Sequence, residues 1–284
     1  MTYDARSDGE RRPEIERTPA QPMKARAVVA PHPKRLRGAA SPPALPCGRP
    51  ELDRILVVMH GEHSCAGRIG QLLKRRGYRL DIRKPRFGSA LPETLAEHAG
   101  AIVFGGPMSA NDPDDYIRRE IDWIGVALKE EKPYLGVCLG AQMLARHLGA
   151  AVAFHPETRV EIGYYDVMPT EAGRLLGPWP EKVYHWHREG FELPAGSTLL
   201  ASGHSGFPNQ AYAYGRAAIG VQFHPEITYT LVNRWSVVAR ERLGLTGAQS
   251  HVLQMEGHVR YQAAVASWLD AFLGRWLERR VTAG

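Results

Sequence analysis

Cysteine is scarce in this chain: its 284 residues contain only Cys47, Cys65 and Cys138. Three widely spaced cysteines are not the disulfide framework of a small secreted domain. No two of them form a C-x-x-C pair, so the commonest zinc-binding pattern is missing as well. The shortage indicates a reducing compartment, and we expect a cytoplasmic protein.

Long apolar runs are also missing. None approaches the roughly 20 residues that a membrane-spanning helix needs, and the N-terminus has no apolar segment like that of a signal peptide. The overall composition, with 44% hydrophobic and 23% charged residues, is ordinary for a globular protein. We therefore expect a globular protein with no membrane partner.

A basic excess is present, but it is confined to one end of the chain. The net charge is +6, and residues 1–50 carry 10 Lys and Arg against 5 Asp and Glu. The same 50 residues hold 9 of the 21 prolines and show no sustained period. We predict a disordered, basic, proline-rich tail over 1–50, with Met23 as an alternative start, and a single domain over 51–284. Because that domain is nearly neutral, we expect no nucleic-acid partner.

Strand-like and helix-like segments alternate over the first part of this domain. One run typical of a strand begins at Arg54, and three others cover 78–84, 101–104 and 133–137. Segments that favour helices lie between or after them, at 66–76, 91–100, 116–130 and 139–149. Such alternation predicts a doubly wound, flavodoxin-like α/β fold in which the sheet is mostly parallel.

Beyond Ala150 the pattern changes to short strand-like runs separated by Gly and Pro turns. These runs predict antiparallel strands added to the sheet. Two C-terminal helices, from Thr228 to Arg242 and roughly from His258 to Arg279, are expected to close the chain.

Cys138 stands at the junction of a predicted strand and helix, in the pattern Gly136-x-Cys138-x-Gly140. A small apolar residue at a helix start is one explanation. The other is a nucleophile elbow, in which a sharp turn strains the nucleophile and the two glycines avoid collisions between strand and helix. The helix N-terminus would then favour the thiolate, which is the reactive form of cysteine.

A histidine and a carboxylate follow later, in VQFHPE, at His224 and Glu226. Pro225 favours an extended backbone at His224, and residues two apart in an extended segment project to the same side. The chain thus offers a nucleophile, a base and an orienting carboxylate in the order Cys138, His224, Glu226. A structural histidine in a turn is the alternative for each residue taken singly.

Backbone N–H groups near Cys138 could bind an oxyanion formed on a substrate carbonyl. The N–H of Leu139 follows the nucleophile directly and would point at this oxyanion. Gly105-Gly106-Pro107 ends another strand at the same sheet edge, where glycines let backbone approach a ligand closely. We predict Gly106 and Leu139 as the two oxyanion donors.

Three motifs together resemble the class I, triad-type glutamine amidotransferase family: GVCLGAQ, QFHPE and, upstream, FGGPMS. The resemblance extends roughly from Arg54 to the first C-terminal helix and is closest to the glutaminase domain of GMP synthase. It implies that Cys138 attacks the side-chain amide carbon of L-glutamine, forms a thioester and releases ammonia. It also implies that His224 transfers protons, that Glu226 orients His224 and that Gln142 contacts the substrate.

The resemblance implies no cofactor and no metal ion. His185, His187 and His204 lie close in sequence, but their spacing fits no common zinc motif. The chain has neither a G-x-x-x-x-G-K-[ST] run nor an S-G-G-x-D-S run for a synthetase. Either a separate synthetase subunit accepts the ammonia, or none does. Two other functions stay open: a γ-glutamyl peptidase or hydrolase with the same triad, and a non-catalytic binding module.

Overall fold

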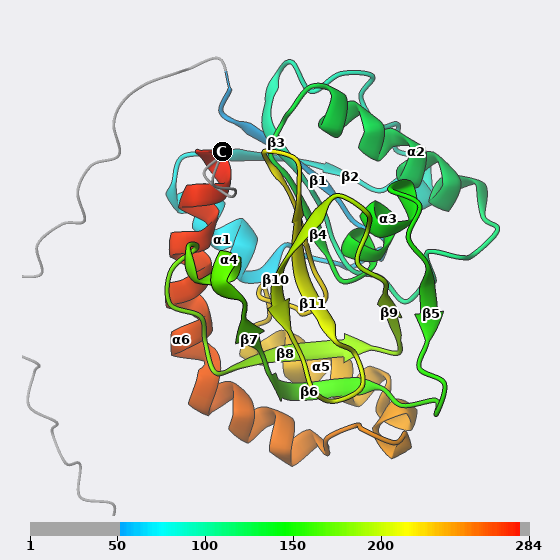
Figure 1. The fold of residues 1–284 in the computed structure, drawn as a ribbon, viewed down its shortest axis with the longest axis vertical. Coiled ribbons are helices and arrows are strands. Elements are labelled where there is room, and N and C mark those ends of the chain that lie inside the picture. Colours follow the sequence, from blue (N-terminus) through cyan, green and yellow to red (C-terminus); the bar gives the residue numbers. More distant parts are fainter. Residues whose placement is uncertain (1–51, 279–284) are drawn as a thin grey trace, which may run out of the picture. The chain divides into compact units, whose positions relative to one another are not determined.

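The fold is built around one large sheet (Figure 1). The computed structural model describes residues 52–278, so the predicted tail over 1–50 lies outside the described residues. The sheet has eight strands in the order β2-β1-β3-β4-β12-β11-β10-β7. Within 52–278, no helix combines the length and the apolar character needed to pass through a bilayer.

The sheet is parallel over its first five strands and antiparallel over the last three. The parallel strands are β1 (Arg54–Val58), β2 (Arg79–Arg83), β3 (His98–Val103), β4 (Tyr134–Val137) and β12 (Ala218–Val221). The antiparallel strands are β7 (Met168–Pro169), β10 (Ser197–Ser202) and β11 (Asn209–Tyr214). The parallel part has the 2-1-3-4-5 strand order of a flavodoxin-like fold, which confirms the predicted fold class.

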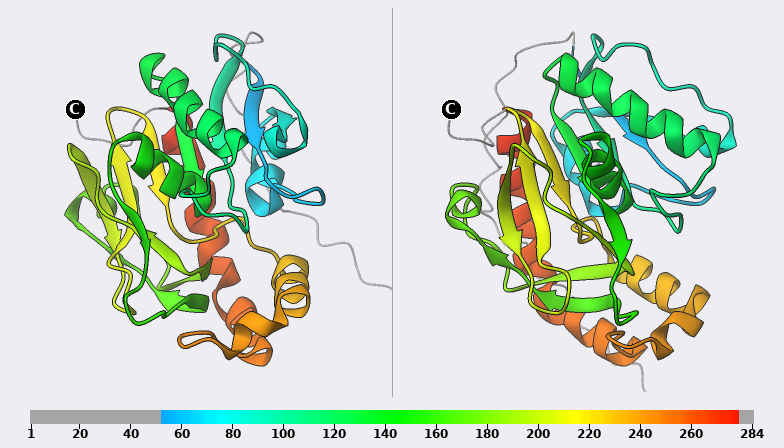
Figure 2. Two further views of the ribbon diagram at one scale, coloured as in Figure 1. Left: turned by 90° about the vertical axis from the view of Figure 1, so that its right-hand side faces the viewer. Right: turned by 45° about the vertical axis from the view of Figure 1, so that its right-hand side comes forward.

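Helices cover both faces of this sheet (Figures 1 and 2). Four of them are α1 (Gly67–Arg75), α2 (Asp115–Lys129), α3 (Leu139–His147) and α6 (His251–Leu277). α1 and α6 pack with Ile55 and Val57 in one core, whereas α2 and α3 pack with Leu56 and Val58 in a second. Because successive side chains of a strand point to opposite faces, β1 serves both cores and is apolar after Arg54.

Four strands outside the central sheet form two small antiparallel sheets. The pairs are β6 (Glu161–Asp166) with β8 (Lys182–His187), and β5 (Val152–Phe154) with β9 (Glu189–Phe191). The remaining elements are η1 (Pro85–Phe87), α4 (Glu171–Arg174), α5 (Tyr229–Val238) and η2 (Arg240–Gly244). The β6–β8 pair, here called the β6–β8 arm, reaches the end of β12, where the Tyr184 carbonyl accepts the His224 N–H at 2.8 Å.

Residues 91–100 do not form the predicted helix. The Leu95 N–H donates to the Glu130 carboxylate at 2.9 Å, and the Ala96 N–H donates to Thr94 Oγ1 at 3.1 Å. Side chains thus bind the backbone donors that a helix would have used internally. The segment forms turns and then enters β3.

The C-terminal half also differs from prediction. Only β7, β10 and β11 extend the sheet in antiparallel fashion, while β12 joins it in parallel and the other strands form the small sheets. The helix predicted over 228–242 gives way to η2, and α6 begins at His251 rather than near His258. The Ser250 hydroxyl accepts the Leu253 N–H at 3.3 Å, an N-cap that the sequence contains.

Candidate active site

Cys138 lies in the sharp turn between β4 and α3, at the C-terminal ends of the parallel strands. Its backbone has φ 50° and ψ −105°, and a positive φ of this kind costs about 1–3 kcal/mol for a residue with a side chain. The Val221 carbonyl accepts the Cys138 N–H at 2.8 Å, while the Cys138 carbonyl accepts the N–H groups of Ala141 and Gln142, both at 3.0 Å. These hydrogen bonds hold the strained turn, which confirms the strain predicted for the elbow.

Gly136 and Gly140 leave no space for a side chain. A Cβ on Gly136 would lie 2.5 Å from the carbonyl group of Gly140. A Cβ on Gly140 would lie 2.0 Å from the carbonyl oxygen of Val103 in β3. The two strands and the helix therefore meet through bare backbone, which is the reason for glycine that the motif predicted.

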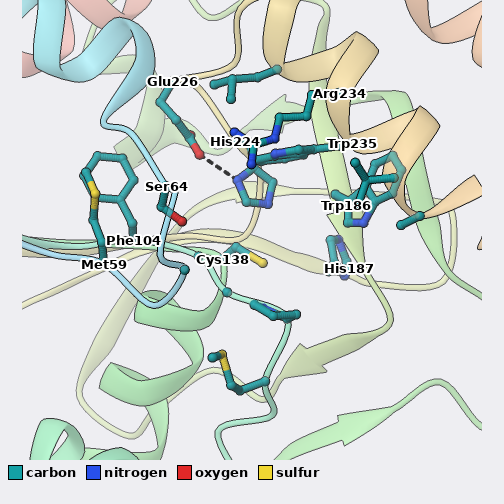
Figure 3. A pocket seen from close by; sticks show the side chains of 18 of the residues that line it. Met59, Ser64, Phe104, Cys138, Trp186, His187, His224, Glu226, Arg234 and Trp235 are labelled. Atoms are coloured by element: carbon teal, nitrogen blue, oxygen red, sulfur yellow. Dashed lines mark hydrogen bonds and ion pairs between the residues drawn. The ribbon is translucent and has the colours of Figure 1, made fainter. Parts of the chain in front are cut away.

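His224 and Glu226 follow β12 and lie over Cys138 (Figure 3). His224 Nδ1 is 2.8 Å from Glu226 Oε1, and both side chains are buried. The Trp235 ring stands edge-on to the imidazole with the ring centroids 4.9 Å apart. The structure thus brings all three predicted triad residues together in one place.

The charges around His224 determine its protonation state. Burial by itself lowers the pKa of His224, but Glu226 and Cys138 outweigh burial and raise this pKa to about 10. The raised pKa favours the imidazolium form of His224, which lies between a carboxylate and a sulfur. A neighbouring imidazolium favours the thiolate form of a cysteine, the form that acts as a nucleophile.

The first turn of α1 fixes the backbone of Glu226. The Arg68 N–H donates to the Glu226 carbonyl at 2.8 Å. Gly67 has φ +49°, and a Cβ there would lie 2.2 Å from the same carbonyl oxygen. The connection between β1 and α1 thus contacts the segment that follows β12. This contact fixes the backbone of the residue whose carboxylate lies beside His224.

The two predicted oxyanion donors occupy different positions. Gly106 borders the cavity above Cys138, whereas the side chain of Leu139 is buried in the core. Leu139 is the first residue of α3, so its N–H has no acceptor within the helix. Only this backbone N–H, and not the side chain, is available for the predicted role.

A buried histidine anchors the peptide between Gly105 and Gly106. His60 Nδ1 donates to the Gly105 carbonyl at 3.2 Å, and His60 Nε2 lies 2.7 Å from Glu120 Oε2. The C=O and N–H of a trans peptide point in opposite directions, so this hydrogen bond turns the Gly106 N–H away from His60. Sequence reasoning missed His60 and Glu120, although His60 lies only two residues after β1.

A cavity of about 460 Å³ opens above Cys138. Its walls are the loops after β1 and β3, the end of β8, and α5 with η2. Trp186–Glu189, at the end of β8 and the start of β9, form one wall. Several lining residues had no signal in the sequence: Gly61, Glu62, Ser64, Arg234, Trp235 and Arg242. They come from loops and helix faces whose approach to the sheet edge depends on tertiary packing.

Gln142, the predicted substrate contact, lines this cavity and is held by the wall. Its Nε2 donates to the Glu189 carbonyl at 2.9 Å and lies 3.3 Å from Gln222 Oε1. The Glu189 carboxylate in turn accepts the Ser109 hydroxyl at 2.8 Å. The Oε1 atom of Gln142 has no hydrogen bond within the described part of the chain, so it can offer an acceptor to a ligand.

Comparison with known proteins identifies the family of this fold and site. The model of the family "Glutamine amidotransferase class-I" matches residues 61–234. This stretch includes Cys138, His224 and Glu226. The chain therefore belongs to the class-I glutamine amidotransferase family.

Individual relatives agree with this assignment. The chain is 34% identical over 189 residues to the glutamine amidotransferase-like protein YfeJ of Salmonella typhimurium, covering 63% of this chain and 78% of the relative. It is 32% identical over 199 residues to a glutamine-hydrolyzing GMP synthase of Aeropyrum pernix, covering 68% of this chain but only 36% of that enzyme. A crystal structure of a glutamine amido transferase from Methylobacillus flagellatus matches with a TM-score of 0.75 and 26% identity, over 82% of this chain and 97% of that one.

Proposed function

We propose that this chain hydrolyses the side-chain amide of L-glutamine. Cys138 Sγ attacks the amide carbon, and His224 gives its proton to the amide nitrogen as the C–N bond breaks and ammonia leaves. Water then attacks the γ-glutamyl thioester and gives its proton to His224, the C–S bond breaks, and glutamate is released. Glu226 orients His224, and the N–H groups of Gly106 and Leu139 bind the oxyanion formed in each step.

The observation that carries this proposal is the meeting of a strained cysteine with a buried ion pair in one cavity. A structural cysteine has no need of φ 50°, and a buried histidine gains nothing for packing from the carboxylate at 2.8 Å. Together they provide a nucleophile, an acid–base group and its orienter, which acyl transfer requires.

The proposal is tested by incubating the purified chain with L-glutamine and measuring ammonia and glutamate. Equal release of both products is expected. γ-Glutamyl dipeptides, tested in parallel, distinguish the second candidate, a γ-glutamyl peptidase or hydrolase. That candidate is favoured by the walls beyond the triad, where Trp186, Trp235 and Arg242 extend the cavity. Hydrolysis of dipeptides without hydrolysis of glutamine would replace the first function by the second.

We also propose that a separate synthetase chain receives the ammonia. The chain spans 36% of the length of the Aeropyrum pernix GMP synthase, and it contains neither of the ATP-site motifs sought in the sequence. Co-purification from the native cell should recover such a synthetase and raise glutaminase activity about tenfold. A recovered partner that leaves glutaminase activity unchanged would contradict this part of the proposal.

The hydrogen bond from His60 to the Gly105 carbonyl leads to a testable expectation for catalysis. Replacing both buried partners, His60→Leu with Glu120→Leu, removes the hydrogen bond without leaving a single charge buried. We expect kcat to fall about 10- to 100-fold because the Gly106 N–H loses its orientation, with little change in KM. The rate of Cys138 alkylation by iodoacetamide should stay near the wild-type value, and a wild-type kcat in the double variant would disprove the anchoring role.

The pKa of His224 leads to a second expectation, for the pH profile. Turnover requires the imidazolium, so kcat should stay high at neutral pH and fall as the pH rises through about 10. The raised pKa also stabilises the folded state, a contribution present in full below about 6.5 and lost as the pH rises through about 10.

Glu226→Gln removes one of the two charges that raise this pKa. The basic limb of the kcat profile should therefore move to lower pH, and kcat at neutral pH should fall by roughly 10²- to 10⁴-fold. Both effects are measured by glutamine hydrolysis between pH 6 and pH 10.5. A basic limb at the wild-type position would show that Glu226 does not control the protonation of His224.

A further inference from the structure

A second group of buried polar side chains lies in the β6–β8 arm, outside the triad. Glu161 of β6 stands directly opposite His187 of β8 in the strand register. His185 is two residues before His187, so the pleat of the strand places both rings on the same face. All three side chains are buried.

Three atoms of this group face one another at short distances. His187 Nε2 is 2.8 Å from Glu161 Oε2, and His185 Nδ1 is 3.2 Å both from this oxygen and from His187 Nε2. In a tetrahedral zinc site with bonds of about 2.0–2.1 Å, ligand atoms lie roughly 3.3 Å apart. The three atoms therefore need to separate by only a few tenths of an ångström to surround one ion.

The hydrogen bonds around these three atoms favour a cation between them. His187 Nδ1 lies 3.0 Å from the Glu189 carbonyl, which can only accept, so Nδ1 carries the proton. In the neutral ring, Nε2 is then a lone pair that faces a carboxylate oxygen. A carbonyl acceptor at Nδ1 is also the usual outer partner of a histidine that binds metal through Nε2.

Hydrogen bonds from other residues orient the carboxylate. Gln210 Nε2 donates to Glu161 Oε2 at 2.9 Å, and the Ser205 hydroxyl donates to Oε1. Two buried polar atoms of this neighbourhood, His185 Nε2 and Gln210 Oε1, have no hydrogen-bond partner among the described residues. A water molecule bound to an ion would supply a donor of the kind that Gln210 Oε1 lacks.

We propose that Glu161, His185 and His187 bind one divalent cation with the ligand preference of Zn²⁺. Two imidazoles and one carboxylate form an N/O donor set that suits Zn²⁺ better than Mg²⁺ or Ca²⁺, which prefer oxygen ligands. His187 also lines the catalytic cavity, which gives the ion a route of entry. The ion would join β6 to β8 and thereby fix the wall that carries Glu189. The sequence-based expectation of no metal ion rested on the spacing of the histidines and included His204, which is exposed. It could not include Glu161, because only the pairing of β6 with β8 brings Glu161 close to His185 and His187.

The test uses the full chain with Cys65→Ser and Cys138→Ser, so that no thiol in the cavity binds metal. After treatment with a chelator, the protein is titrated with Co²⁺, whose visible absorption reports tetrahedral coordination, and then with Zn²⁺. We expect one Co²⁺ per chain, displacement by one Zn²⁺, and a Tm higher by about 2–5 °C at saturating Zn²⁺. Absence of Co²⁺ absorption together with an unchanged Tm would overturn the proposal.

Single variants then locate the site. Glu161→Gln and His187→Asn should each weaken Zn²⁺ binding at least about 100-fold, while His204→Asn, an exposed histidine nearby, should bind as the parent does. Far-UV circular dichroism shows whether each variant is folded. If a variant fails to fold, the Co²⁺ and Zn²⁺ titrations of the parent protein still decide whether the chain binds an ion. Equal loss of binding in His204→Asn would place the ion elsewhere and refute the assignment.

Discussion

Replacing Cys138 by Ala is expected to lower glutamine hydrolysis by roughly 10⁴-fold or more, because no other group in the proposed mechanism can form the thioester. The variant removes a single sulfur from the elbow. Its Tm should stay close to that of the wild type. The measurement is the rate of ammonia and glutamate release at saturating glutamine.

Cys65 provides the matched control for this experiment. It is an exposed, free cysteine that borders the same cavity, and nothing in the sequence gave it a role. Cys65→Ala should retain nearly full activity. Hydrolysis at the wild-type rate by Cys138→Ala, or its loss in Cys65→Ala, would show that the nucleophile has been assigned wrongly.

Gly140→Ala is expected to cost about 3 kcal/mol or more of the free energy of unfolding. Its new Cβ would lie 2.0 Å from the Val103 carbonyl oxygen, so α3 or β3 has to move. For a domain of this size the Tm should fall by roughly 6–12 °C. Activity should fall as well, because the same shift displaces Cys138 and the Leu139 N–H.

Gly244 is the matched control for the elbow glycine. It lies in η2, and a Cβ there would meet nothing within 4 Å. Gly244→Ala should therefore change the free energy of unfolding by less than about 1 kcal/mol. Similar destabilisation by both substitutions would mean that close packing at the elbow is not the reason for glycine at position 140.

The sequence predicted the parallel half of the fold well because β1, β3 and β4 are apolar runs that local pattern identifies. The triad positions were proposed from the two motifs around Cys138 and His224 and from the family resemblance that these motifs carry. The strand before His224 was expected to be antiparallel, whereas β12 pairs with β4 in parallel, so both strands end at a common edge.

The rest depended on contacts between distant segments. Glu161 joins the histidines only through the register of β6 with β8, and His60 acts on Gly105 only because the ends of β1 and β3 lie side by side. The turn over 91–100 was mistaken for a helix because the Glu130 carboxylate that binds its backbone lies in another element. Local sequence carries no signal for such partners.

The central claim is that Cys138 carries a γ-glutamyl thioester during turnover. It is tested most directly by mixing the chain with glutamine, quenching rapidly in acid, and mapping the modified peptide by mass spectrometry. We predict one glutamyl group on the peptide that contains Cys138, lost on treatment with hydroxylamine, and none on the peptide that contains Cys65. Release of glutamate with Cys138 unmodified at every quench time would contradict the claim.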